Sequence, residues 1–202
     1  MEIKQKYEEL FEKLADMEVE ELAQFFNCSP NDILFDDITD ESEFNSIPYK
    51  VICGDIELSD QALVEDFGNI EAVLGSINIG RYPSLESDIT SLGKLKYVYG
   101  DLRAGFSQLC NLGDLLAVGG CVDLESADLK STGSLEYVGE DLIIRDNSDL
   151  KDASSLKYIG KNLDSQGTQI SSFDNLEYVG GSIDKDEDTV IDASVTNHGR
   201  IR

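Results

Sequence analysis

The chain has 202 residues and a formal net charge of −25, from 41 acidic and 16 basic residues. Hydrophobic residues make up 41% of it, which is enough for a continuous core and argues against a wholly disordered chain. Because nucleic acids and anionic membranes are bound through Lys and Arg, the charge argues against both as direct partners. It suits a protein partner with a basic surface, or simply a soluble cytosolic protein.

The apolar stretches, the N-terminal residues and the cysteine spacing indicate the compartment and the state of the thiols. No stretch approaches the roughly 18 apolar residues of a membrane span, and Met1 to Leu14 is charged throughout, without a secretory core. We therefore expect a cytoplasmic protein. The four cysteines contain no C-x-x-C pair and lie far from the single histidine, so we expect free thiols, no metal site and no cofactor; they are Cys28, Cys53, Cys110 and Cys121.

Residues 1–48 differ from the rest of the chain. From Ile3 to Phe26 the apolar residues recur at steps of three and four, which predicts a helix with an acidic outer face. Ser29-Pro30 predicts the start of a second short helix, and residues 36–43 an acidic loop. We expect this segment to be a helical cap on the open end of the repeats that follow. The alternative is a helix that docks a partner or a second copy.

From about residue 49 a motif of about twenty residues recurs, most clearly at 135–139, 156–160 and 176–180. Apolar residues two and four places after each start predict one short strand per unit with inward side chains. Later leucines at three-residue steps predict tight turns or a short 3₁₀ segment. This period predicts a stacked solenoid. The units start near Gly54, Gly75, Gly100, Gly120, Glu140, Lys161 and Gly181.

The core pattern L-x-L-x-x-(N/T/S)-x-L resembles leucine-rich repeats, in the variant V-G-x-L-x-I-x-x-T-x-L that is similar to bacterial and phage forms and to receptor L domains. The resemblance covers about residues 49–190. It implies an α/β solenoid: a leucine-rich-repeat array of about seven short parallel strands, over residues 49–192, with an N-terminal helical cap and a C-terminal tail at 193–202.

At the asparagine-ladder position of that family, this chain departs from the pattern. A continuous ladder of buried amides is therefore not expected, and hydroxyl groups should replace it in part. The residues at this position are Gln61, Ser107, Ala127, Asn147 or Ser148, Thr168 and Asp188.

Two further features recur or stand out along the repeats. The second unit is longer, and residues 80–84 (Gly-Arg-Tyr-Pro-Ser) are the expected insertion, either a binding loop or a bulge. A tyrosine column is expected to stack on the back of the solenoid, through packing or as a second contact surface. It comprises Tyr97, Tyr137, Tyr158 and Tyr178, with Ala72 and Ala117 at the equivalent places of two other units.

The sequence contains none of the usual catalytic motifs: no P-loop, no G-x-G-x-x-G after a strand, no G-x-S-x-G and no H-E-x-x-H. His198 lies in the expected tail, where a solvated side chain is the default. Residues 184–188 have the alternating acids of a calcium loop, but Thr189 and Val195 stand where that loop needs Gly and Glu. We therefore expect no catalytic residue and no metal ligand.

A leucine-rich solenoid would present the residues between the inward positions on its concave sheet face. Carboxylates there outnumber the two arginines, and like charges on neighbouring strands repel unless a basic partner relieves them. Such a face suits fast, salt-sensitive capture of a cationic surface. The candidate partner-binding residues are Asp55, Glu57, Asp101, Arg103, Asp123, Glu125, Asp141, Ile143, Arg145, Asp164, Asp184 and Asp186.

These observations predict a non-enzymatic protein-binding module, and an inhibitor or immunity-type protein that masks a basic site is one attractive form of it. The alternative is a self-associating structural scaffold, joined through the N-terminal helix or a solenoid edge. An enzyme is the remote third possibility. The sequence leaves the oligomeric state open between monomer and homodimer.

Overall fold

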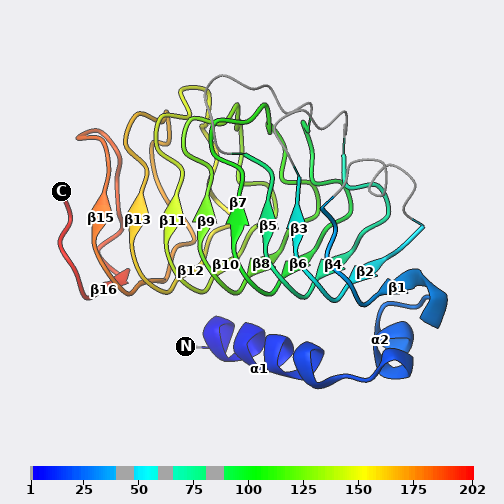
Figure 1. Ribbon diagram of the computed structural model, residues 1–202. Coiled ribbons are helices and arrows are strands. Elements are labelled where there is room, and N and C mark those ends of the chain that lie inside the picture. The colour runs from blue at the N-terminus through cyan, green and yellow to red at the C-terminus, as the bar shows by residue number, and fades with distance from the viewer. Residues whose placement is uncertain (1, 40–47, 59–65, 81–88) are drawn as a thin grey trace.

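The computed structural model describes residues 2–39, 48–58, 66–80 and 89–202. Helices α1 (Glu2–Asp16) and α2 (Val19–Phe25) and a 3₁₀ turn η1 (Pro30–Asp32) precede a parallel β-solenoid (Figure 1). The helix expected at Ser29-Pro30 is confirmed as that 3₁₀ turn: the Ser29 hydroxyl accepts a hydrogen bond from the Asn31 amide at 3.2 Å. The solenoid architecture expected from the repeat period is confirmed.

Each coil contributes to two parallel sheets rather than to one. Sheet A contains, in spatial order, β1 (Ile33–Leu34), β2 (Val51–Ile52), β4 (Ala72–Val73), β6 (Tyr97–Val98), β8 (Ala117–Val118), β10 (Tyr137–Val138), β12 (Tyr158–Ile159), β14 (Tyr178–Val179) and β16 (Thr196–Asn197). Sheet B contains β3 (Ile56–Glu57), β5 (Ile77–Asn78), β7 (Leu102–Arg103), β9 (Val122–Asp123), β11 (Leu142–Ile143), β13 (Leu163–Asp164) and β15 (Ile183–Asp184). The prediction of one strand per unit was wrong. A second pair of residues in each coil, just before the unit start, also forms a strand; Tyr137 and Val138, for example, pair with the equivalent residues of both neighbouring coils.

The third side of each coil is a repeated side-chain turn. A polar residue accepts a hydrogen bond from the amide two places on, as in Asn111 to Gly113 at 2.7 Å and Asp152 to Ser154 at 3.0 Å. These residues bridge from coil to coil, for example Ser91 with Asn111. Local side-chain acceptors of this kind are typical of turns. The expected tight turns are confirmed.

The interior is a single elongated hydrophobic core that runs from Ile38 to Ile183. Its leucines, isoleucines and valines come from both sheets and from the third side, and nearly all have no exposed surface. Burial of each such side chain stabilises the fold by about 1.5–3 kcal/mol. The shared hydrophobic interior expected from the repeat is confirmed.

The glycine that ends each Val-Gly or Ile-Gly pair is required by close stacking at the corner. A Cβ atom on Gly160 would lie on the carbonyl oxygen of Gly139 in the preceding coil, and one on Gly180 on that of Gly160. A substitution at these positions would therefore push two coils apart. This explains why the motif recurs with glycine.

Asn147 is the one described amide that is buried at the ladder position, with 1% of its surface exposed. Its Nδ2 donates to the carbonyls of Leu124 and Ile144 at 2.8 and 2.9 Å, and its Oδ1 accepts from the Leu129 amide at 3.1 Å. The side chain thus joins two coils from inside the turn.

Hydroxyl groups take this role in other coils, as the sequence predicted. Ser107 and Thr168 donate to the carbonyl three residues earlier, at 2.6 and 2.9 Å. In the last of these turns Asp188 is exposed and its neighbour Thr189 is buried instead, donating to a carbonyl of the preceding coil at 2.9 Å. Gln61 lies outside the described residues.

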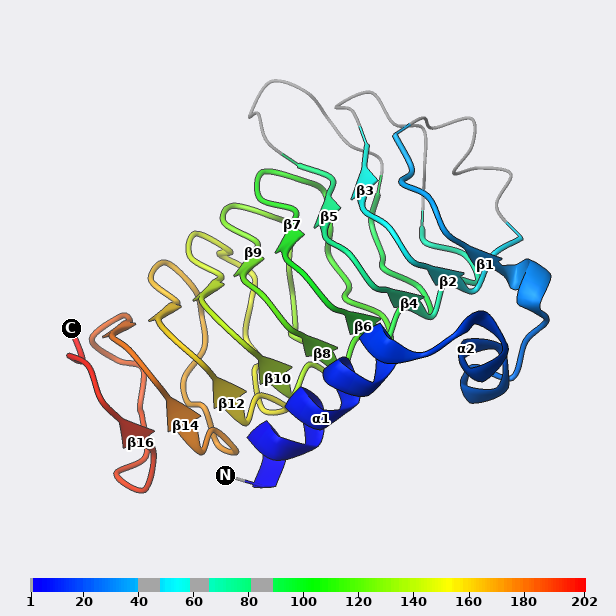
Figure 2. The same cartoon turned by 60° about the horizontal axis from the view of Figure 1, so that its bottom comes forward.

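The tyrosine column stacks along sheet A beneath helix α1, which runs along the solenoid (Figure 2). The rings of Tyr137 and Tyr158 lie 5.0 Å apart at 7°, and those of Tyr158 and Tyr178 lie 4.8 Å apart at 6°. Tyr137 and Tyr158 are 3% and 5% exposed. Packing, one of the two interpretations of this column, is therefore confirmed for these two residues.

The alanines of the column make room for phenylalanines of the N-terminal segment. Phe11 of α1 clusters with Ala117 and meets Tyr137 at 6.3 Å between ring centroids. Phe26 clusters with Ala72. A tyrosine at either place would compete for the space of the phenylalanine.

The helical cap is present, and it reaches farther than the sequence indicated. Helix α2 covers the first coils, where Leu22 and Phe26 pack against Val51, and β1 extends sheet A at this end. Helix α1 does not cross the open end of the solenoid. It lies along its side, with Tyr7 and Phe11 over the tyrosine column.

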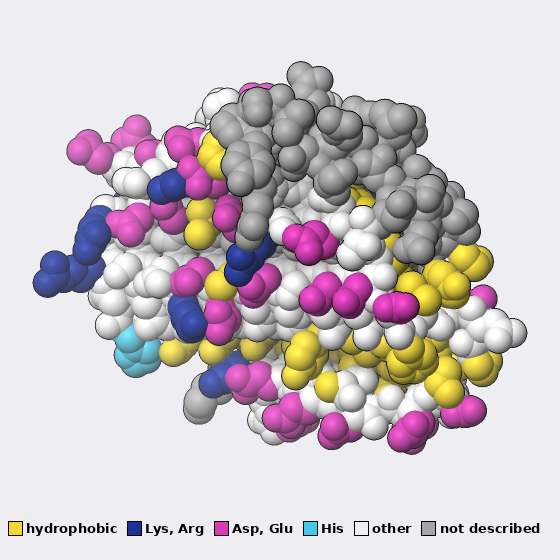
Figure 3. Space-filling model, viewed as in Figure 1, with side chains coloured by type: hydrophobic (Ala, Val, Ile, Leu, Met, Phe, Trp, Pro, Cys, Tyr) yellow, Lys and Arg dark blue, Asp and Glu magenta, His cyan; other side chains and the backbone are white. Residues whose placement is uncertain are grey.

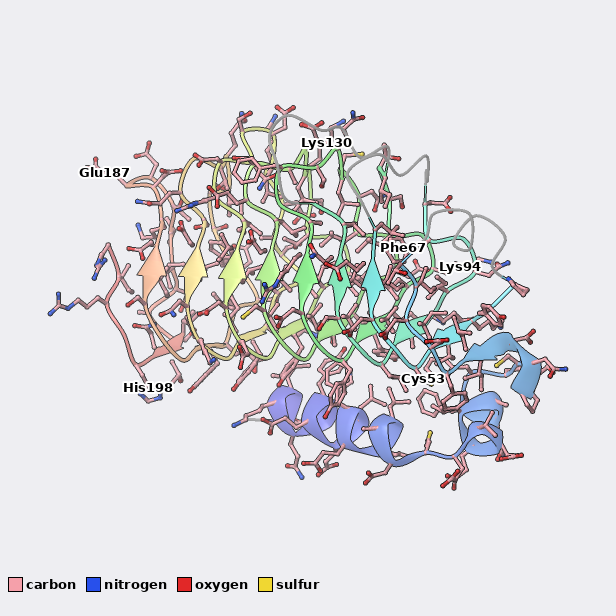
Figure 4. The ribbon with its side chains drawn as sticks, viewed as in Figure 1. Cys53, Phe67, Lys94, Lys130, Glu187 and His198 are labelled. Carbon is pink, nitrogen blue, oxygen red and sulfur yellow. The ribbon has the colours of Figure 1, made fainter. Side chains whose placement is uncertain are left out.

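Residues 193–202, expected to be a tail, continue the solenoid. Strand β16 pairs with β14, Ile201 bridges to Ile183, and the Arg202 amide donates to the Ile183 carbonyl at 2.9 Å. The boundary expected at residue 192 therefore lies inside the last coil. His198 remains exposed, with its ring edge-on to Tyr178 at 5.7 Å (Figure 4).

In the part of the chain that the structure describes, neither helix has the length and apolar character needed to cross a membrane.

Replacing Asn147 with alanine should lower the free energy of unfolding by about 2–3 kcal/mol, because buried carbonyls and an amide lose their partner. Urea denaturation followed by circular dichroism measures the change. The exposed neighbour Ser148→Ala is the control and should shift stability by less than about 0.5 kcal/mol. Equal stability of the two variants would contradict a structural role for the amide.

Candidate acidic face of sheet B

The twelve candidate residues all lie on the outward face of sheet B, where Asp and Glu side chains are spread over the surface (Figure 3). They form three columns that run across the coils. The first column is Asp55, Ser76, Asp101, Cys121, Asp141, Asn162 and Ser182; the second is Glu57, Asn78, Arg103, Asp123, Ile143, Asp164 and Asp184. The third is Gly80, Gly105, Glu125, Arg145, Gln166 and Asp186.

The first column is a polar ladder in which five side chains accept from the backbone of the next coil, with Cys121 as an interruption. Asp55 Oδ1 accepts from the Ser76 amide at 2.6 Å, and Ser76 Oγ from the Asp101 amide at 3.1 Å. Asp101 Oδ1 accepts from the Cys121 amide at 2.8 Å. The pattern continues from Asp141 to the Asn162 amide at 2.8 Å.

Three of the predicted partner-binding residues therefore have a structural role that the sequence reading did not include. One carboxylate oxygen of Asp55, Asp101 and Asp141 is committed to the neighbouring coil. The other oxygen of Asp101 accepts from Arg103 at 2.7 Å. The recurrence of Asp, Ser or Asn one place after six of the seven unit starts was the sequence signal for this ladder.

Arginines relieve part of the charge in the other two columns. Arg145 reaches Glu125 at 2.7 Å and Asp164 at 3.7 Å, so it joins three successive coils. Burial, with the charge of nearby Asp184, raises the pKa of Asp164 although Arg145 opposes this. The carboxylate of Asp164 is therefore incompletely neutralised and would be stabilised by a further cation close to it.

Other carboxylates on the face are less engaged. Within the described part of the chain, Asp123 accepts only from the Glu125 amide two places on, at 3.2 Å. Asp184 lies 3.9 Å from Arg202. Glu57 is exposed and makes no hydrogen bond or ion pair with the other described residues.

A shallow hollow of about 220 Å³ lies at the first three coils of this face. Its walls are polar, with Glu57 and Asp101 on either side of Asn78, next to Arg103. Across the described residues no group of three or more His, Cys, Asp or Glu side chains is placed to hold a metal ion. The hollow is shallow, and its lining includes the carboxylates of Asp55, Glu57 and Asp101 and the guanidinium of Arg103.

The predicted insertion at 81–84, the neighbouring position 59 on the face and part of the acidic loop at 36–43 lie outside the described residues. Gly80, the first residue of the insertion, is in the third column.

Burial raises the pKa of three of the four thiols, those of Cys28, Cys53 and Cys121. All four are free and half-buried, and burial raises the pKa of Cys53 to about 11. Burial also raises the pKa of Cys121, whose thiol donates to Glu140 at 3.2 Å. A thiol that stays protonated at neutral pH is a poor nucleophile.

Comparisons with protein-family models, with curated proteins and with solved structures give no match to this chain. Its function is therefore argued from its own residues.

The first-column ladder predicts a pH effect at Asp101. Although burial alone would raise its pKa, the Cys121 amide and Arg103 hold the pKa of Asp101 below its usual value. The folded-state pKa is thus lower than the unfolded one. The stabilisation is present above about pH 4, the unfolded value, and is lost as pH falls through the folded pKa.

Asp101→Asn keeps an oxygen that can accept from Cys121, as Asn162 does in its own coil, so it should remain folded but lose this part of the acid dependence. Asp101→Ala should cost about 1 kcal/mol more than the asparagine variant at pH 7. Urea denaturation of the three proteins between pH 3 and 7 measures both effects. Parallel pH profiles for wild type and Asp101→Asn would refute the assignment.

Proposed function

We propose that this chain is a non-enzymatic protein-binding module of the leucine-rich-repeat type, which holds a basic protein surface on the outward face of sheet B. The observation that carries the proposal is the in-register arrangement of carboxylates in three columns on one sheet. In each column most carboxylates are separated by a neutral or basic residue, but Asp164 and Asp184 are paired directly on neighbouring strands, about 4.8 Å apart, and repel one another at close range. A cationic partner would relieve that repulsion.

The intramolecular contacts divide the carboxylates of the face into two groups, those held by the backbone of the next coil and those with few contacts. Asp55, Asp101 and Asp141 are held by the ladder, which fixes the position of their second oxygens. In Asp101 that second oxygen is already paired with Arg103, whereas in Asp55 and Asp141 it remains available among the described residues. Glu57 and Asp184 have little or no counter-charge of their own. Preorganised acceptors beside unneutralised carboxylates favour Lys and Arg side chains of a partner.

A partner with a concentrated positive surface fits this face best, because affinity from charge pairs grows with the number that can form together. An inhibitor or immunity-type protein in the cytoplasm, which masks a basic active site or a nucleic-acid-binding site, is the specific form that we propose. The −25 charge of the whole chain would add long-range attraction to such a partner.

The charge mechanism is tested with a ten-residue lysine peptide and the double variant Glu57→Gln/Asp184→Asn. The variant should bind the peptide about threefold more weakly at 50 mM NaCl, and wild-type binding should be lost at 500 mM because exposed charges are screened. Fluorescence anisotropy of the labelled peptide measures both.

The matched control is Glu12→Gln/Glu20→Gln, which removes the same charge from exposed positions on the two N-terminal helices. It should leave the affinity almost unchanged. An equal loss in both double variants would show that the total charge, and not the sheet B face, binds cations. The same immobilised proteins, exposed to an extract of the native host, then identify the natural partner by mass spectrometry.

A self-associating scaffold is the second candidate, and the C-terminal end of the solenoid favours it. Val190 and Ile201 are 60% and 52% exposed there, beside the edge strand β16. An open edge offers unpaired backbone groups to a second copy. Helix α1 is a poorer means of association, because its apolar stripe is already packed on sheet A.

Light scattering at micromolar concentration decides between the two candidates. The binding module should be a monomer, whereas a scaffold joined at the C-terminal edge should be a dimer or larger. For a scaffold, Ile201→Lys should restore the monomer by placing a charge at the edge.

A further inference from the structure

A second polar site lies on the opposite side of the first coils, in the row just before the sheet A strands. Lys50, Glu71 and Lys96 occupy equivalent places in three successive coils, since the Glu71 amide donates to the Lys50 carbonyl and the Lys96 amide to that of Glu71. Glu71 Oε1 lies 3.1 Å from the Lys50 ammonium, and Oε2 lies 2.7 Å from that of Lys96. One carboxylate is thus shared by two cations.

This triad leaves a local excess of positive charge in a strongly acidic protein. Although burial would raise the pKa of Glu71, the hydrogen bonds from Lys96 and Lys50 hold it below its usual value, so the carboxylate is ionised. The net charge of the triad is therefore +1. Each lysine retains N–H donors beyond the one that it gives to Glu71.

An open hollow of about 420 Å³ lies beside the triad, at the seam between α2 and sheet A. Phe25, Phe26 and Tyr97 form its aromatic wall. Phe25 is 40% exposed, and its ring meets Phe26 edge-on at 4.9 Å. The ammonium of Lys13 lies 5.7 Å from the centre of the Phe25 ring.

A similar triad of one glutamate and two lysines occurs at Glu136, and there the ring of Tyr7 from α1 occupies the space beside it. Glu136 is shared by Lys157 at 2.7 Å and by Lys6 of α1 at 3.3 Å. Beside it lies the ring of Tyr7, which contacts Tyr137 at 5.2 Å and donates its hydroxyl to Glu136 at 2.9 Å. At this second triad the protein supplies its own aromatic group, whereas at Glu71 the place next to the aromatic wall is open.

We propose that the hollow at Glu71 binds an aromatic carboxylate, either a small acid or the C-terminal Phe or Tyr of a peptide. The ring would lie against Phe25 and Tyr97, and the carboxylate would accept from Lys50 and Lys96. Both oxygens of Glu71 are already paired with lysines, whereas each lysine keeps further N–H donors, so the site favours an anionic ligand over a cationic one. A hollow of this volume accommodates one ring and one carboxylate, and its open side predicts modest affinity.

The direct test is a titration of ¹⁵N-labelled protein with N-acetylphenylalanine, followed by NMR. The dissociation constant should be about 1 mM, as a ligand of this size in an open site allows. Shifts should map to the residues that line the hollow. N-acetylphenylalaninamide, which lacks the carboxylate, should bind about tenfold more weakly.

The tripeptide Gly-Gly-Phe separates the two sources of the ligand: tighter binding than N-acetylphenylalanine indicates a peptide C-terminus, and weaker binding indicates a small acid. Equal binding of acid and amide, or shifts that map elsewhere, would overturn the proposal.

Two variants and a matched control locate the site. Lys96→Gln and Phe25→Ala should each weaken N-acetylphenylalanine binding about tenfold. Lys157→Gln removes the equivalent lysine from the filled triad and should leave binding unchanged. A loss as large in Lys157→Gln as in Lys96→Gln would refute the site, and the NMR spectra of the free variants show whether each is folded. Because the hollow lies away from sheet B, its failure would not affect the function proposed for that face.

Discussion

Stacking of coils in register is the constraint on which the rest of this structure depends. Strands of only two residues cannot hold a sheet by themselves, so stability comes from repeating the same backbone hydrogen bonds from coil to coil. Register then brings equivalent residues face to face: Val73 meets Val98, and Tyr158 meets Tyr178. The residue at each position of the motif must therefore pack against the equivalent residue of the next coil, about 4.8 Å away.

Apolar residues meet this condition inside the core, and glycine meets it at the tight corner. Tyrosines meet it by parallel stacking, and α1 then removes their rings from water. Carboxylates are the difficult case, because stacked like charges repel. The chain handles them in two ways, with backbone amides of the next coil for Asp55, Asp101 and Asp141, and with alternating Lys and Glu beside sheet A.

The sequence was sufficient to predict the solenoid, its inward positions and the partial hydroxyl ladder, because a period near twenty with apolar alternation has few other solutions. It was not sufficient for the second sheet, since a strand of two residues leaves no alternation to detect. The last coil was missed because Thr196 replaces the tyrosine and the coil is shorter: Tyr178 pairs with Thr196, 18 residues on, whereas Tyr158 pairs with Tyr178, 20 residues on. The turn at Asp192 and Ser194 still carried the motif.

The surface on which α1 packs could not be predicted from the sequence. An amphipathic stripe says that a helix packs against something, but not against which surface. Ala72 and Ala117 marked the gaps in the tyrosine column, yet only the structure shows that Phe26 and Phe11 occupy them. The candidate face had a similar limit. Sequence pattern placed its residues on one surface, but could not show which carboxylates were already used by the fold.

This distinction bears directly on how the molecule can recognise a partner. A residue such as Asp101, bound to Cys121 and Arg103, contributes position more than free charge, whereas Glu57 contributes charge with little constraint. Among the described residues, helix α1 packs on sheet A and no helix packs on sheet B, whose carboxylates are neutralised only in part by Arg103 and Arg145. The lysine-rich hollow at Glu71 is separated from it by the core. The two proposed sites share no lining residue and differ in local charge, so a substitution in one should leave the other unchanged.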